Sequence, residues 1–135
     1  MALFEWNDIY GVNIKQLDQQ HRRLVEMVND LDDSIRTGND EVVLKETLKK
    51  LLDYTAYHFV YEEKLLKQYD YSDLMRHREE HNVLLWRVLD LRGRYKSGEG
   101  VQASEVLNFL TGWLKNHILN SNKQYGAFLN SKGVR

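Results

Sequence analysis

Apolar residues recur every three to four positions along four segments of the chain, the spacing that makes one face of an α-helix apolar. The segments run from about residue 18 to 37, 41 to 68, 73 to 96 and 102 to 120. The stripes consist of Leu17, Leu24, Val28, Leu31 and Ile35; Leu44, Leu48, Leu51, Leu52, Thr55, Phe59 and Leu65; Leu74, Leu84, Leu85, Val88 and Leu91; and Val106, Phe109, Leu110, Trp113 and Leu114. The chain has no proline, so nothing forbids helices of this length.

The breaks between these segments carry residues that commonly end or begin helices. Gly38 is expected to cap the first helix, and Asn39 or Asp40 to begin the second. In the YDYSD stretch, Ser72 or Asp73 can cap the third helix, and SGEG forms the loop before the fourth. Four helices joined by short turns predict an all-α fold, an antiparallel up-down-up-down four-helix bundle.

A single domain is expected over residues 1–135, because this length can bury a core without covalent staples. Residues 1–17, rich in aromatic side chains, are predicted to form an extended arm that packs across the bundle. The bundle itself is assigned to residues 18–122, and residues 123–135 follow it as a C-terminal segment.

Charge and composition exclude several classes of function. The net charge is −1, so the chain lacks the basic footprint of a protein that binds nucleic acid or anionic lipid. Cysteine is absent, which removes disulfides, thiolate nucleophiles and zinc–thiolate sites. Neither a signal peptide nor an apolar run of about 20 residues is present, so a cytoplasmic protein without membrane contact is expected. The mixed surface charges favour a monomer.

Five histidines lie on or beside the apolar stripes, and all four predicted helices contribute. They are His21, His58, His77, His81 and His117. Any one of them can be explained as a core histidine bonded to a backbone carbonyl. Burying imidazole nitrogens without partners costs roughly 1–3 kcal/mol each, however, and five such residues from four helices need common partners. A metal shared inside the bundle would provide them.

A carboxylate joins this group. Glu62 follows His58 by four residues and therefore lies on the same helical face. The alternative is a surface glutamate paired with a lysine, but the residue four positions on is Leu66, which offers no pair. The neighbouring Glu63 points about 100° away and is expected to face solvent.

Other known patterns fit less well. The string HREEH matches the H-x-x-E-H of inverted zinc proteases, but a bundle this small offers little substrate cleft. The Glu-x-x-His pairs of ferritin-like di-iron bundles are missing from the sequence. Haem ligation by a pair of histidines stays open as an alternative, although it would leave three inward histidines unexplained.

The order of these residues resembles hemerythrin, in its single-domain bacterial form. The resemblance rests on a lone histidine, H-x-x-x-E, H-x-x-x-H and a further histidine on four successive helices. It spans nearly the whole chain, through FEWND, DQQH, HFVYEE, HREEH, WLKNHI and KQYGAFL.

The resemblance implies a non-haem centre of two iron ions (Fe2+/Fe3+) with a bridging oxo or hydroxo group, which binds O2 reversibly for storage, delivery or sensing. It implies O2 or small anions as partners. By this resemblance His77, His81 and His117 hold one iron, His21 and His58 hold the other, and Glu62 bridges them. The residues implied as walls of the O2 pocket are Leu24, Phe59, Trp113, Leu114, Ile118 and Tyr125.

Asn122 departs from the family pattern, because an aspartate is expected there as the second bridge. An amide lacks the negative charge and has only one oxygen to offer a metal. The substitution is expected to loosen metal retention, to disfavour the ferric state and to open a coordination position. A di-iron enzyme with peroxidase-like or O2-reducing activity is therefore an alternative function. A further alternative is that Asn122 only caps the fourth helix.

Overall fold

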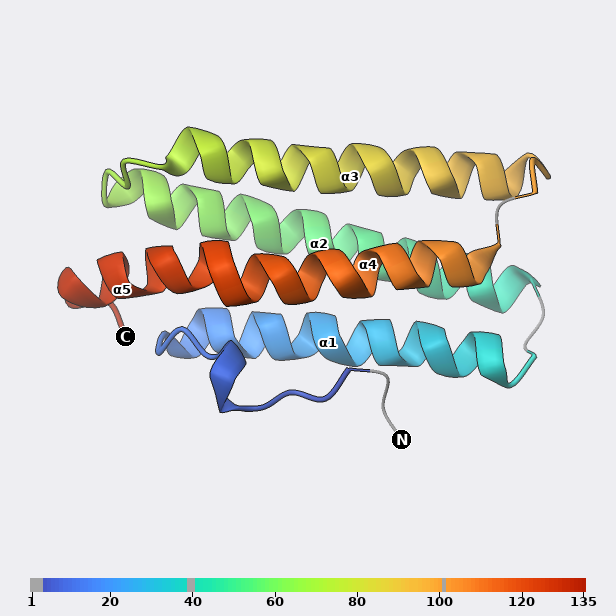
Figure 1. Cartoon of the computed structure of the whole chain (residues 1–135), viewed down its shortest axis with the longest axis horizontal. Helices are drawn as coiled ribbons and strands as arrows, with labels where there is room; N and C mark the ends of the chain where they lie inside the picture. The colour runs from blue at the N-terminus through green and yellow to red at the C-terminus, as the bar shows by residue number, and fades with distance from the viewer. Residues whose placement is uncertain (1–3, 39–40, 101) are drawn as a thin grey trace.

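The computed structural model describes residues 4–38, 41–100 and 102–135, and these contain helices and no strand. The elements are η1 (Asp8–Tyr10), α1 (Lys15–Arg36), α2 (Glu41–Gln68), α3 (Leu74–Lys96), α4 (Ala103–His117), η2 (Ile118–Asn122) and α5 (Lys123–Ser131). The long helices α1 to α4 lie side by side and alternate in direction, and α5 continues the line of α4 (Figure 1). The predicted all-α, up-down-up-down bundle is confirmed. No helix in the described part of the chain is long and apolar enough to cross a membrane.

The helix ends agree with the sequence in part. Gly38 follows Thr37, the C-cap of α1, and adopts the left-handed φ of 69° that favours glycine after a helix. Asn39 and Asp40, the expected start of α2, lie outside the described residues. Asp73, one of the two residues expected to cap α3, occupies its N-cap position, although its side chain makes no cap bond. Its backbone carbonyl instead accepts the first helical hydrogen bond, from the amide of His77.

The N-terminal arm is less extended than predicted. It contains the short 3-10 helix η1, and α1 begins three residues earlier than expected, at Lys15. Asn29 on α1 fixes the start of the arm, since its side chain bonds both the amide and the carbonyl of Phe4. The arm then crosses to the far end of the bundle, where the Lys123 ammonium donates to the Gly11 carbonyl.

The buried apolar side chains form two clusters rather than one. The larger cluster contains Leu24 of α1, Phe59 of α2, Leu84 of α3 and Ile118 of η2. The smaller contains Val12, Ile14, Leu17, Leu66, Tyr125 and Leu129. Along their helices, His21, Glu62 and Asn122 fall between residues of the two clusters. His77 and His81 lie between Leu84 of the larger cluster and Leu74, which packs against the smaller one. His58 and His117 lie at the edge of the larger cluster and face Glu62 and its partners. A polar layer therefore crosses the core of the bundle.

One residue of the apolar stripe predicted for α2 is not the one that the structure buries. The sequence placed Leu65 inward on α2, yet Leu66 is fully buried and Leu65 only partly. The reason is that Glu62 faces the centre, and the residue four positions on must share its face.

Candidate metal centre

The five histidines and Glu62 converge at the polar layer, and all six side chains are buried. Glu62 is the common partner. His77 Nε2 lies 2.5 Å from Oε1, and His81 Nε2 lies 3.2 Å from the same atom. Oε2 lies 3.0 Å from His58 Nε2 and 3.2 Å from His21 Nε2. One carboxylate thus faces two groups of imidazoles, one on each of its oxygens.

The ligand atoms divide into two groups that could each hold a metal ion. His77, His81, His117 and Glu62 form the first, which we call the three-histidine position; His21, His58 and Glu62 form the second, the two-histidine position. This is the grouping that the sequence resemblance implied.

Helical spacing explains how the chain brings these atoms together. Residues four apart on an α-helix stand one turn above each other, which aligns His58 with Glu62 and His77 with His81. Asn122 is five residues after His117, and in an α-helix it would point about 140° away. The π-helical turn η2 corrects this, because its i→i+5 bonding places the fifth residue over the first. Both side chains are buried as a result.

The hydrogen-bond pattern fits a bound cation. His81 Nδ1 donates to Glu63 at 2.8 Å, and His117 Nδ1 donates to Glu80 at 3.0 Å. A neutral imidazole that donates through Nδ1 has only a lone pair at Nε2. The two Nε2 atoms nevertheless lie 3.1 Å apart. Two facing lone pairs need a proton or a metal ion between or beside them, so the donor set suits a metal that prefers imidazole and carboxylate.

The protonation tendencies follow from burial and from these contacts. Burial lowers the pKa of His58, and it lowers the pKa of His117 to about 4. For His81 burial acts downward too, but the bonds to Glu62 and Glu63 outweigh it and raise the pKa. Burial alone would raise the pKa of Glu62, yet the surrounding histidines hold it well below its usual value. The central carboxyl is therefore ionised and available as a ligand.

Three partners of the histidine Nδ1 atoms were not foreseen from the sequence. The expectation that Glu63 faces solvent is wrong, because it reaches from α2 to His81 and Arg78 on α3. Glu80 bonds His117 across the α3–α4 contact, and Gln20 Oε1 lies 2.6 Å from His58 Nδ1. Each pair joins two helices, so no spacing within one helix could have revealed it.

Asn122 lies at the two-histidine position. Its Nδ2 is 3.2 Å from His21 Nε2, and its buried Oδ1 has no hydrogen-bond partner among the described residues. The capping alternative is wrong, since Asn122 has helical backbone angles and the helix continues into α5. The side chain points into the centre, where its unpaired oxygen is a free acceptor.

The residues expected to wall an O2 pocket gather around the same layer. Phe59 stacks on His81 at 3.7 Å between ring centroids, and Trp113 stacks on His117 at 4.3 Å. Leu24, Leu114 and Ile118 are buried in the larger cluster beside Phe59. Tyr125 differs from an apolar wall, because its hydroxyl donates to Glu62 Oε2 at 2.7 Å. Burial and the nearby Glu62 charge raise its pKa well above the usual value, which keeps it a donor.

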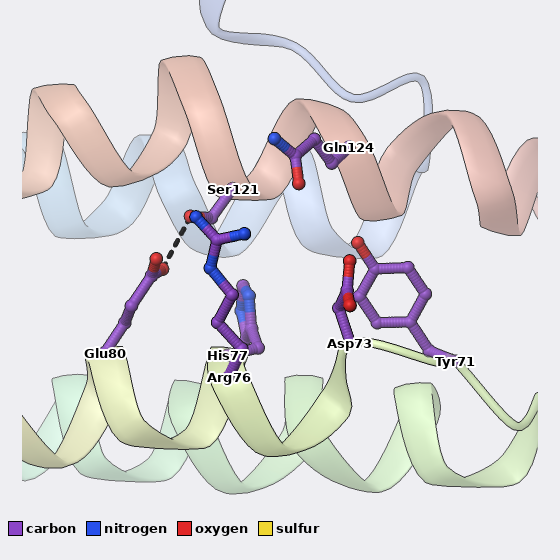
Figure 2. A pocket seen from close by; sticks show the side chains of 7 residues that line it. All are labelled: Tyr71, Asp73, Arg76, His77, Glu80, Ser121 and Gln124. Carbon is purple, nitrogen blue, oxygen red and sulfur yellow. Dashed lines mark hydrogen bonds between the residues drawn. The ribbon is translucent and has the colours of Figure 1, made fainter.

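A polar hollow opens beside the three-histidine position, between α3 and the η2–α5 segment. It is lined by Tyr71, Asp73, Arg76, His77, Glu80, Ser121 and Gln124. Figure 2 shows Glu80 of α3 bonded to Ser121 of η2 across this hollow, with Arg76 projecting into the space between the two segments. This side of the centre is therefore covered mainly by polar side chains.

A helical bundle with two buried histidine–carboxylate groups around one shared glutamate defines a metal-binding helical protein. Comparison with known proteins makes the class specific. Residues 12–129 match the model of the hemerythrin HHE cation binding domain. The chain belongs to the hemerythrin family.

The similarity to individual relatives spans most of both proteins in each pair. Bacteriohemerythrin of Pseudomonas aeruginosa (strain LESB58) is 36% identical over 125 residues, which is 93% of this chain and 80% of that protein. Bacteriohemerythrin of Methylococcus capsulatus (strain ATCC 33009 / NCIMB 11132 / Bath) is 35% identical, over 97% of this chain and all of that protein. A crystal structure of wild-type hemerythrin superposes with a TM-score of 0.87 at 34% identity, covering 93% of this chain and 97% of that one.

Proposed function

We propose that this chain binds O2 reversibly at a non-haem centre of two iron ions, for O2 storage, delivery or sensing. The observation that carries the proposal is the convergence of five buried imidazoles on Glu62. In this proposal His77, His81 and His117 hold one iron, His21 and His58 hold the other, and Glu62 bridges them. Family membership supports the choice of iron. Two bound iron ions would supply one electron each to O2 and recover both on its release.

The protein's own contribution is the environment of the bound molecule. The two-histidine position offers fewer protein ligands, so it is the proposed binding side for O2 or a small anion. Phe59, Trp113 and the aliphatic residues Leu24, Leu114 and Ile118 would exclude water from the centre as a whole. The Tyr125 hydroxyl holds Glu62 in place by its hydrogen bond. Limited water and proton access slows irreversible oxidation, which reversible binding requires.

The experiment is anaerobic loading with Fe2+ followed by exposure to air and renewed removal of O2. We expect two iron ions per chain and a visible charge-transfer band that forms with O2 and disappears when O2 is removed. Glu62→Ala should lose both the band and part of the iron. Glu79→Gln, at an exposed position on α3, serves as the matched control and should behave as wild type. Less than one iron per chain in the wild type would overturn the proposal.

A second candidate function rests on Asn122. Without the anionic bridge, the centre is more positive by one charge and Asn122 Oδ1 is left unpaired. These features favour turnover of peroxide or O2 over stable carriage. Steady-state oxidation of an added reductant by the iron-loaded protein tests this candidate, and a stable, reversible band without turnover would rule it out.

We also propose that the chain acts as a monomer. Most of its ion pairs on the surface lie within single helices, as between Lys49 and Asp53. Against this, α3 exposes several large apolar side chains, including Met75, Val83 and Trp86. Light scattering across a range of protein concentrations decides the matter, since a constant monomer mass is expected and a stable dimer would contradict it.

A further inference from the structure

The two metal positions differ in the charge of the groups behind their histidines. At the three-histidine position, the Nδ1 atoms of His81 and His117 donate to the carboxylates of Glu63 and Glu80. At the two-histidine position, His58 Nδ1 faces the neutral amide of Gln20, and the buried His21 Nδ1 has no partner among the described residues. The two positions differ in their number of histidines, but because Glu62 is shared, their difference in charge lies in these outer partners.

The carboxylates at the three-histidine position are held in place by further bonds. Glu80 Oε2 accepts a hydrogen bond from Ser121 Oγ at 2.5 Å, and Figure 2 shows this link from α3 to η2. Glu63 Oε1 accepts from Arg78 Nε at 3.2 Å. Their side chains are only 31% and 22% exposed. Both carboxylates are therefore oriented before any metal arrives.

A carboxylate that accepts the Nδ1–H of a ligating histidine makes the opposite nitrogen a stronger donor to the metal. Loss of such a partner typically weakens metal binding about 10- to 100-fold. Among the described residues, the three-histidine position has two of these carboxylate partners and the two-histidine position has none. Asn122 widens the difference, because a neutral amide stands beside His21 where a carboxylate would add charge.

We propose that Glu63 and Glu80 are positioning residues that make the three-histidine position the stronger of two unequal divalent-metal sites. The metal then binds in two steps, and a form with one metal ion, held by His77, His81 and His117, is populated before the second ion enters. This proposal rests on the proposed dinuclear centre but not on its O2 chemistry.

Titration of the metal-free protein with Zn2+, followed by calorimetry, measures both steps without O2 or redox change. We expect two separate steps with the first tighter by more than the statistical factor. NMR of the histidine ring nitrogens at one equivalent of Zn2+ should show shifts in His77, His81 and His117 and none in His21 and His58.

Single substitutions distinguish the proposed positioning role of Glu63 and Glu80 from a general effect on folding. Glu80→Gln keeps an acceptor for His117 and Ser121 but removes the charge, so the first step should weaken about 10- to 100-fold while the second changes little. Glu63→Gln should act likewise. Glu79→Gln, the exposed neighbour of Glu80, is the matched control and should change neither step. Gln20→Glu should strengthen the second step and bring the two constants together.

Two results would overturn the inference: equal intrinsic constants for both steps, or an effect of Glu80→Gln that falls equally on both. The first Zn2+ shifting His21 and His58 would overturn it as well. Absence of any tight Zn2+ binding would refute the proposed dinuclear centre itself. Two tight Zn2+ sites of equal affinity would agree with the dinuclear centre and contradict only the proposed difference in affinity between its two positions.

Discussion

Among single residues, Asn122 sets the charge and the free ligand atoms at the two-histidine position. Its amide donates to His21 and leaves a buried oxygen unpaired, so it offers a metal at most one neutral ligand atom. An aspartate at this position would add a negative charge at the two-histidine position. Two unit charges 4 Å apart interact with an energy of about 4 kcal/mol at an effective dielectric constant of 20.

Asn122→Asp should therefore tighten the second Zn2+ step by at least about tenfold, because even a fraction of that Coulomb energy exceeds 1.4 kcal/mol. The same change should lower the melting temperature of the metal-free protein, since a second buried carboxylate would then face Glu62. Zn2+ calorimetry and thermal melts measure the two effects. Asn120→Asp, at an exposed position of η2, is the control. An unchanged second step would contradict this account of Asn122.

The buried histidines predict how the metal-free protein responds to acid. Burial lowers the pKa of His117 to about 4 and also lowers that of His58. The unfolded chain binds these protons at about pH 6.5, so it gains protons relative to the folded chain as the pH falls below that value. The free energy of unfolding should therefore decrease between about pH 6.5 and 4.

His81 does not oppose this trend in that window. Its raised pKa gives a stabilisation that is complete below pH 6.5 and is lost only as the pH rises. Urea unfolding of the metal-free protein at several pH values checks the prediction, and His117→Gln should show a shallower slope than wild type. A free energy that is flat from pH 6.5 to 4.5 would disagree with it.

The sequence predicted the residues of the centre better than their supporting partners. Periodicity places a residue on a face of its own helix, which sufficed to put the five histidines and Glu62 inside the bundle. Glu63, Glu80 and Gln20 act across helix–helix contacts, and their reach depends on the rotation of two helices. Glu63 was expected to be exposed for this reason. A carboxylate next to a ligand in sequence can still bond a histidine on the neighbouring helix.

At the scale of the elements, the fourth helix does not end where its apolar stripe ends. The π-helical turn η2 allows the helix to continue as α5, so a single line of helix carries His117, Asn122 and Tyr125 to the centre. The sequence could not indicate this, because a five-residue spacing looks like a broken helical pattern. The arm and α5 then pack together and, with Leu17 of α1 and Leu66 of α2, build the smaller apolar cluster.

Gly126 of α5 packs against Val12 of the arm with no room for a larger side chain. A Cβ added there would lie 2.9 Å from Val12 Cβ and 3.2 Å from the Val12 carbonyl oxygen. Gly126→Ala should therefore destabilise the protein by about 1–3 kcal/mol through overpacking. The matched control is Gly112→Ala on α4, where a Cβ meets nothing within 4 Å.

Gly112→Ala should stabilise the protein by about 0.5–1 kcal/mol, because alanine is the better helix former at an open position. Chemical denaturation of both variants measures the two effects in the same assay. If Gly126→Ala were as stable as Gly112→Ala, the arm would not be packed against α5 as the structure has it.

Across the full length of the bundle, the polar layer lies between a larger apolar cluster, to which all four long helices contribute, and a smaller one built from the arm, α1, α2 and α5. The layer between them places a carboxylate and five imidazoles in a buried environment. Burial of such groups is costly unless their partners are satisfied. A metal ion that binds several helices at once would satisfy them and join the clusters into one cooperative unit.

Metal removal should therefore lower the stability of the entire bundle. A ligand that binds only the folded state stabilises it by about 2.7 kcal/mol at 100 times its dissociation constant. We expect Zn2+ to raise the melting temperature by roughly 5–20 °C over the protein in EDTA, at about 2–8 °C per kcal/mol. Mg2+ at the same concentration is the control, since it prefers oxygen ligands and should give little shift.

Hydrogen exchange should show added protection in both clusters when Zn2+ binds, because the polar layer contacts each of them. Protection confined to one cluster would mean that the centre stabilises its own end of the bundle without coupling the two.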